Sequence, residues 1–134
     1  MRLLLTSLAA LGLVSTAAAA ADALACTGPF GEIADAPAFT VPAGSLGPGE
    51  SGMTCPPIPS DRTVTAVECL VRIAKPTGPD TVFRCPVGAP CADVGTFQKI
   101  ERIKGPMGLD QLCATYVNPG EGKQIFGIRA TLAR

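Results

Sequence analysis

The stretch TVTAVECLVRI, residues 63–73, decides the fold class. It is rich in β-branched residues, and its charged side chains Glu68 and Arg72 are separated by apolar ones. A period of two predicts a strand with one face in a core and the other face outward. The inward set is expected to be Val67, Cys69, Val71 and Ile73, with Leu70 as the one apolar residue on the outward face.

The residues after this stretch predict a β-hairpin over 63–85. The sequence KPTGPD at 75–80 is a turn in which proline fixes φ and glycine permits a positive φ. Residues 81–85 then return as a second strand.

A second hairpin is predicted at the end of the chain. Residues 112–117 are strand-like, NPGEG at 118–122 is a turn, and residues 125–132 form the returning strand. In the returning strand one face is apolar, and it comprises Phe126, Ile128, Ala130 and Leu132.

The segment between the hairpins fits no period cleanly, because Phe97, Ile100 and Ile103 are spaced three apart. We expect a strand there, and an edge strand over 37–41, where proline is tolerated. Five or six short strands predict a mainly β fold, a small antiparallel sandwich or barrel.

The first 21 residues have the order of a secretory signal peptide: Arg2, an apolar run, then small residues. The run is shorter than the ~20 apolar residues of a membrane-spanning helix. Small residues precede three candidate cleavage points, before Ala21, before Asp22 and before Cys26. The last would suit a lipoprotein anchored through Cys26, but it would leave an odd number of thiols.

Removal of residues 1–21 would leave one secreted or periplasmic domain, 22–134, with two compositional parts. Residues 22–61 carry five acidic and no basic residues, seven prolines and six glycines. Residues 62–134 carry ten basic and six acidic residues and most of the strand signals. We expect a loop-rich acidic layer that folds against a weakly basic, strand-rich body, since mixed charges are the default on a globular surface.

The chain has six cysteines, an even number that suits three disulfides in an oxidising compartment. The sequence suggests Cys85–Cys91 as a local bridge. It also suggests Cys69–Cys113 between two core strands and Cys26–Cys55 in the acidic part, although six cysteines allow 15 pairings. Their spacing does not match zinc, iron–sulfur or redox motifs, so we expect no metal and no cofactor.

Catalytic motifs are scarce. There is no histidine in the chain, so a serine triad has no base, and the glycine-rich residues 47–52 do not have the ending of a phosphate-binding loop. Paired carboxylates, Glu68 with Glu101 or Asp110, are the one route to a hydrolase, and outward surface charges are the simpler interpretation.

The chain also shows little sign of nucleic-acid binding. Its basic and acidic residues are equal in number, and the small cluster of Lys99, Arg102 and Lys104 is interrupted by Glu101. We interpret this cluster as a solvated face.

The sequence therefore predicts an exported, disulfide-stabilised monomeric β module that binds an unidentified protein or envelope component, or has a structural role there. An alternative is an inhibitor of an extracellular enzyme. Its candidate binding loop is the pre-organised segment between Cys85 and Cys91, which comprises Pro86, Val87, Gly88, Ala89 and Pro90. A histidine-free carboxylate hydrolase is the second alternative.

Overall fold

A computed structural model describes residues 21–33, 44–74, 77–91, 94–120 and 122–134. In this part of the chain all regular structure is β, as the alternating patterns predicted. The described residues form ten strands: β1 (Ala21–Leu24), β2 (Gly31–Ile33), β3 (Gly44–Leu46), β4 (Ser51–Thr54), β5 (Pro57–Pro59), β6 (Thr63–Ile73), β7 (Thr81–Cys85), β8 (Thr96–Ile103), β9 (Leu109–Val117) and β10 (Gln124–Ala133). The edge strand expected over 37–41 lies outside the described residues.

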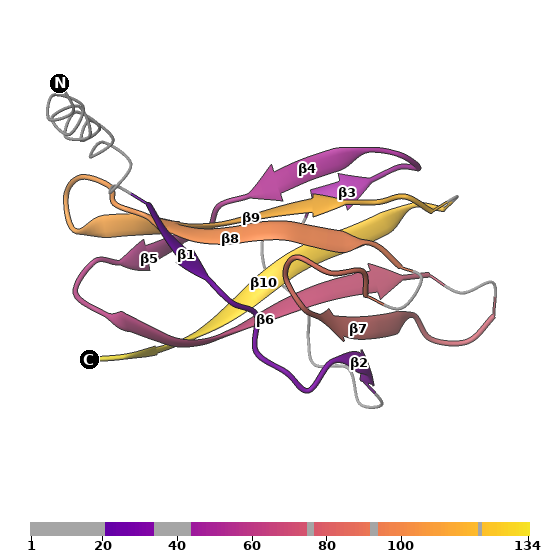
Figure 1. The fold of residues 1–134 in the computed structure, drawn as a ribbon, viewed down its shortest axis with the longest axis horizontal. Helices are drawn as coiled ribbons and strands as arrows, with labels where there is room; N and C mark the ends of the chain where they lie inside the picture. Colours follow the sequence, from indigo (N-terminus) through magenta and orange to yellow (C-terminus); the bar gives the residue numbers. More distant parts are fainter. Residues whose placement is uncertain (1–20, 34–43, 75–76, 92–93, 121) are drawn as a thin grey trace, which may run out of the picture.

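The strands form two antiparallel sheets that lie in two layers (Figure 1). The first has the order β1-β8-β9-β4, and β5 also pairs with β9. The second has the order β2-β7-β6-β10-β3. The short strands from the Pro- and Gly-rich part of the chain lie at the edges of both sheets, and the long strands of the body lie at their centres.

The stretch that decides the fold behaves as its period predicts, except at Leu70, which was expected on the outward face with the charges and is only 1% exposed. Val67, Cys69 and Val71 of β6 lie in the core. Glu68, on the opposite face, accepts hydrogen bonds from Arg84 and Arg129. The predicted hairpin over 63–85 is present, with β6 and β7 paired from Cys69–Cys85 to Ile73–Thr81.

The three-residue spacing between Phe97 and Ile100 in β8 arises from an irregularity in its pairing with β9. Phe97 lies opposite Tyr116 and Lys99 lies opposite Thr115, so Gln98 is an extra residue on the β8 side. This bulge lets both Phe97 and Ile100 point into the core. The predicted strand is therefore present. One inserted residue explains the spacing of Phe97 and Ile100, whereas Ile103 lies on the opposite face from Ile100 because the pairing is regular beyond the bulge.

The predicted hairpin between residues 112–117 and 125–132 is wrong. β9 pairs with β8, β4 and β5 in one sheet, whereas β10 pairs with β6 and β3 in the other. The two strands face each other across the core, where the rings of Tyr116 and Phe126 stack with centroids 5.3 Å apart. Both strands have an apolar face, and facing sheets bury both of these faces.

Asn118 anchors the crossing between the sheets. Its Nδ2 donates to the carbonyl oxygens of Leu46, Gly47 and Gly122 at 2.8–3.1 Å. The side chain is fully buried, so these bonds satisfy an amide that would otherwise be costly in the interior. They fix the β3–β4 turn against the segment that leads to β10.

All six cysteines are in disulfides, Cys26–Cys69, Cys55–Cys113 and Cys85–Cys91. The local bridge has the expected partners, but the other two pairings differ from the predicted ones. Cys69 points into the core, whereas Cys113 alternates with the core residues Leu112 and Ala114 and so lies on the outer face of its sheet. Cys69 and Cys113 therefore do not meet across the core.

Candidate functional site

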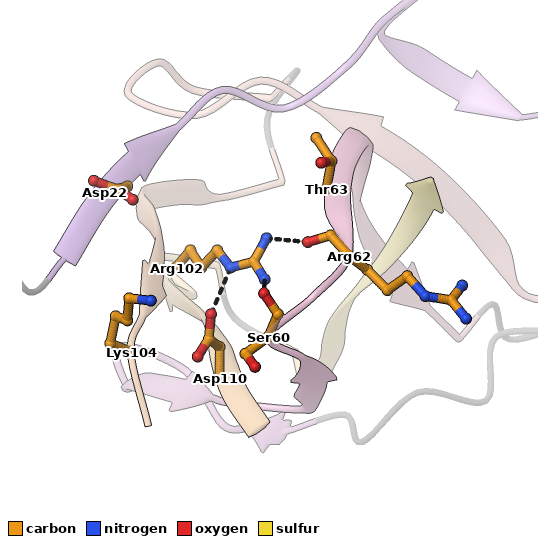
Figure 2. Close-up of a pocket in the computed structure, with 7 residues that line it drawn as sticks. All are labelled: Asp22, Ser60, Arg62, Thr63, Arg102, Lys104 and Asp110. Carbon is orange, nitrogen blue, oxygen red and sulfur yellow. Dashed lines mark hydrogen bonds and ion pairs between the residues drawn. The ribbon is translucent and has the colours of Figure 1, made fainter. Parts of the chain in front are cut away.

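Two hollows lie side by side at the end of the sandwich where β8 turns into β9, and Asp110 lines both. The first is a polar cavity of about 220 Å³ (Figure 2). It is lined by Asp22, Ser60, Arg62, Thr63, Arg102, Lys104 and Asp110. The second is a largely apolar groove of about 440 Å³. It is lined by Pro57, Gly105, Pro106, Met107, Leu109, Asp110 and Gln111.

Asp110, which lines both hollows, forms an ion pair with Arg102, which lines the polar cavity. Arg102 Nε donates to Asp110 Oδ2 at 2.9 Å. The rest of the guanidinium donates to the carbonyl oxygens of Arg62 at 2.7 Å, Pro59 at 3.1 Å and Ser60 at 3.3 Å. These bonds use the donors of Arg102 within the protein, so this arginine holds the turn after β5 in place.

The electrostatics of Asp110 follow from the same contacts. The hydrogen bond from Arg102 lowers the pKa of Asp110 from its ordinary value of 3.8, burial opposes this shift, and the Gly105 amide adds to the lowering. The Gly105 N–H donates to Asp110 Oδ1 at 3.2 Å. Asp110 is therefore ionised at neutral pH and paired, which makes it a poor general acid.

The other charged residues lie at the rim of the polar cavity. In Figure 2, Lys104 and Asp22 lie on one side of Arg102, and the side chain of Arg62 extends away on the other side. The Lys99, Arg102 and Lys104 cluster is thus not a single solvated face, because Arg102 turns inward. The cause is alternation along β8, which places Arg102 on the same face as Ile100.

The tip of the β8–β9 hairpin forms the groove. Leu109 N donates to Pro106 O, and the two central residues Met107 and Gly108 have φ values of 58° and 79°. Two consecutive positive φ angles are typical of a type I′ turn, in which Asn-Gly is the favoured pair. Met107 is 95% exposed and Leu109 is 52% exposed.

Two contacts hold this tip in a defined position. Ser60 N donates to Gly108 O at 2.9 Å, and β5 pairs with the first residues of β9. A Cβ on Gly105 would lie 2.3 Å from the carbonyl oxygen of Leu109, so the neck of the hairpin requires glycine. These contacts therefore hold the turn in one position, with its apolar residues exposed at the tip.

The candidate loop 86–90 is only partly at the surface. Val87 forms a bridge with Phe97 and packs against the core, and Gly88 N donates to Phe97 O at 2.7 Å. Gly88, Ala89 and Pro90 are exposed. The accessible part of the loop is thus three residues, held by the Cys85–Cys91 bridge.

The carboxylates considered for hydrolysis lie apart in the fold. Glu68 is on the outer face of the second sheet and pairs with Arg84 and Arg129. Glu101 is on the outer face of the first sheet, with Lys99 at 3.5 Å, and Asp110 pairs with Arg102. Each has its own cation, and of the three only Asp110 lines either hollow.

Sequence reasoning missed the hairpin tip. The available signal was the order Pro-Met-Gly-Leu, in which a large apolar residue occupies a turn position that normally favours Asn.

The chain matches no protein-family model, no curated protein and no solved structure. Within the described ranges, no group of three or more His, Cys, Asp or Glu side chains is arranged to hold a metal ion. The same part of the chain contains no helix that is long and apolar enough to cross a membrane.

Proposed function

We propose that the protein is an exported, non-enzymatic β module that binds a partner protein through the apolar tip of the β8–β9 hairpin. The observation that carries this proposal is Met107, a nearly fully exposed apolar side chain in a left-handed turn position. The partner it suits is a protein segment that presents an apolar side chain to the groove between Met107 and Pro57.

Met107 is unfavourable for the isolated fold in two ways. A non-glycine residue in the left-handed region costs roughly 1–2 kcal/mol, and Asn tolerates this region better than Met. An exposed Met beside a half-exposed Leu also leaves apolar surface in water. Met107 is thus unfavourable for the free protein through both its backbone conformation and its exposed apolar surface. A contact with another molecule explains its presence at this position.

Three disulfides support export. They tie the loop after β1 to β6, the β4–β5 link to β9, and β7 to the segment before β8. Such bridges persist in oxidising compartments, which agrees with the leader-like first residues. They also suit a role at the envelope or outside the cell, where a small domain with few aromatic residues gains stability from covalent links.

The pairing of the carboxylates supports a binding role over catalysis. A general acid or base works best with a pKa near the operating pH, and the pKa values of Asp110 and Glu68 are both lowered. For Glu68, burial opposes the lowering, and the hydrogen bonds from Arg129 and Arg84 outweigh it.

Site-specific cross-linking tests the proposal. A photoreactive amino acid at position 107 should give a defined cross-linked product in the native host, whereas one at Met53 should not. Met53 is the matched control because it is also apolar, 62% exposed and in the first sheet.

Leu109→Asp should abolish the product from position 107 while leaving the melting temperature nearly unchanged. Equal labelling from positions 107 and 53, or a product that survives Leu109→Asp, would contradict the proposal. Turnover of ester, glycoside or peptide substrates by the purified protein would contradict its non-enzymatic part.

A second candidate is inhibition of an extracellular enzyme through the loop closed by Cys85 and Cys91. The feature in its favour is the exposed triplet Gly88-Ala89-Pro90, pinned by the disulfide and by the Gly88–Phe97 hydrogen bond. Pre-organisation of this kind reduces the entropy lost on binding. Ala89→Asp should then weaken inhibition of the target enzyme, and Leu109→Asp should leave it unchanged.

A further inference from the structure

We propose that Met107 is an oxidation site: a peroxide converts its thioether to the sulfoxide, and this change weakens partner binding at the hairpin tip. The effect on binding rests on the proposed function, whereas the oxidation site stands on the exposure of the side chain alone. Met107 is 95% exposed, in the turn between β8 and β9.

Met107 is the most accessible oxidisable side chain that the described residues present. The chain has no tryptophan and no histidine, and its six cysteines are already joined as disulfides. The single tyrosine, Tyr116, is fully buried. Of the three methionines, Met1 lies outside the described residues and Met53 is 62% exposed. The thioethers are therefore the main targets for a peroxide, and Met107 is the more exposed of the two described ones.

The turn holds the Met107 side chain away from the rest of the protein. Its φ of 58° places it in the left-handed region, and both of its neighbours, Pro106 and Gly108, are exposed. Gly108 O accepts a hydrogen bond from Ser60 N, which fixes the backbone beside Met107. The side chain takes no part in the hydrophobic core. The folded structure thus neither shields the sulfur nor depends on it.

The chemical step is a two-electron oxygen transfer. A lone pair of the Met107 sulfur attacks one oxygen of hydrogen peroxide, and the O–O bond breaks. The oxygen bonds to sulfur, its proton passes to the leaving hydroxide, and water departs. The thioether is oxidised to the sulfoxide and the peroxide is reduced to water.

The sulfoxide makes the tip of the groove polar. The apolar side chains that line the groove are those of Pro57, Pro106, Met107 and Leu109. The sulfoxide oxygen is a hydrogen-bond acceptor, and its burial against an apolar partner side chain that offers no donor costs free energy. Oxidation therefore turns a favourable apolar contact into an unfavourable one.

Peptide mapping by mass spectrometry tests the oxidation site. The purified protein is treated with dilute hydrogen peroxide, both folded and in urea, and the sulfoxide at each methionine is followed with time. Met107 should oxidise in the folded protein within about twofold of its rate in urea, because nothing in the fold shields it. It should also oxidise faster than Met53, the matched control on β4. A folded-state rate at Met107 well below the rate in urea, or below the rate at Met53, would overturn the site.

Cross-linking from a neighbouring position tests the effect on binding. Gln111 is exposed and lines the groove, so a photoreactive amino acid at this position reports on the site while Met107 is kept. In a Met53→Leu background, the untreated protein should give a defined product with an extract of the native host, and peroxide should lower the yield of this product by about tenfold.

The outcomes separate the two proposals. An equal yield before and after peroxide would overturn the effect on binding and leave the proposed function standing. If the untreated protein gives no defined product, the proposed function fails together with its regulation, and the oxidation rates alone decide the oxidation site.

Two controls separate oxidation of Met107 from damage elsewhere. Met107→Leu keeps an apolar tip that peroxide cannot oxidise, so the cross-link yield of this variant should be the same before and after treatment. Oxidised and untreated Met53→Leu protein should have the same urea midpoint, because the Met107 side chain lies outside the core. Peroxide sensitivity of Met107→Leu, or a fall in the midpoint, would overturn the claim that the sulfoxide of Met107 acts directly on binding.

Discussion

Arg102 and Asp110 pair at 2.9 Å on the inward side of the β8–β9 ladder, at the open end of the sandwich. Their side chains are 16% and 3% exposed. Along both strands, inward-facing core residues alternate with outward-facing ones up to this point. The last inward-facing residues, however, are charged instead of apolar. The pair joins β8 and β9 to the turn after β5, because Arg102 also binds the carbonyl oxygens of that turn.

Asp110→Asn should lower the stability of the protein and reduce its sensitivity to acid. Because the folded-state pKa of Asp110 is lowered below 3.8, its stabilising contribution is complete above the unfolded-state value and is lost as the pH falls through the folded-state value. When urea unfolding is measured from about pH 5 to about pH 2, the free energy of unfolding should fall less in the variant than in the wild type.

Asp110→Asn should still lose some stability in acid, since the lowered pKa of Glu68 makes stability depend on pH in the same direction. The control is Lys99→Gln, which breaks an exposed pair with Glu101 and should change the free energy of unfolding by less than ~1 kcal/mol. Identical pH profiles for wild type and Asp110→Asn would show that Asp110 does not contribute.

Tyr116→Phe should destabilise the protein by about 1–3 kcal/mol, since it leaves a buried acceptor without its donor. Tyr116 Oη donates to Gln124 Oε1 at 2.6 Å and so links the two sheets, and burial raises the pKa of the phenol. A double-mutant cycle with Gln124→Met should show a coupling of at least ~0.5 kcal/mol. Additive effects would mean that the hydrogen bond is not a stabilising link.

Gly95→Ala should be among the most damaging single-methyl changes, with a cost of about 1–3 kcal/mol or more. A Cβ at this position would lie 2.0 Å from Tyr116 Oη and 2.6 Å from Val117 O. Gly122→Ala is the matched control, because its Cβ would meet nothing within 4 Å. Thermal unfolding of both variants checks the contrast, and equal melting temperatures would rule out close packing at Gly95.

Met107→Asn should stabilise the isolated protein by a few tenths to about 1 kcal/mol, because Asn relieves part of the cost of the left-handed conformation. The urea midpoint should rise with no change in the slope. Met53→Asn, on the extended strand β4, should not stabilise. If Met107→Asn lowers the midpoint, Met107 contributes to the free fold, and the main argument for a binding tip is lost.

The class of fold could be predicted from alternation alone, since residues 63–73 show which face is buried. The crossing from β9 to β10 could not, because a turn such as NPGEG suits a hairpin as well as a change of sheet. The packing of Tyr116 against Phe126 across the core determines that β9 and β10 lie in different sheets, and this contact has no local signal in the sequence.

The disulfide pairing was predictable in part. Leu112 and Ala114 are both apolar, so alternation alone would have placed Cys113 on the outer face and excluded a core bridge to Cys69. The partner of Cys113 depends on the path of β4 and β5 beside β9, which only the sheet topology shows. The candidate site was missed because its signal is one residue, Met107, in an unfavourable turn position.

The two kinds of disulfide should differ in their effect on stability. Replacing Cys55 and Cys113 by Ala opens a link between residues 58 positions apart, whereas Cys85 and Cys91 are 6 apart. In the loop-entropy description the long bridge contributes ~4 kcal/mol and the short one ~2.4 kcal/mol. Urea unfolding of the two double-alanine variants should therefore give the lower midpoint for Cys55/Cys113. The reverse order would show that the short bridge stabilises chiefly through the native packing of Val87 against Phe97, and not through the unfolded chain.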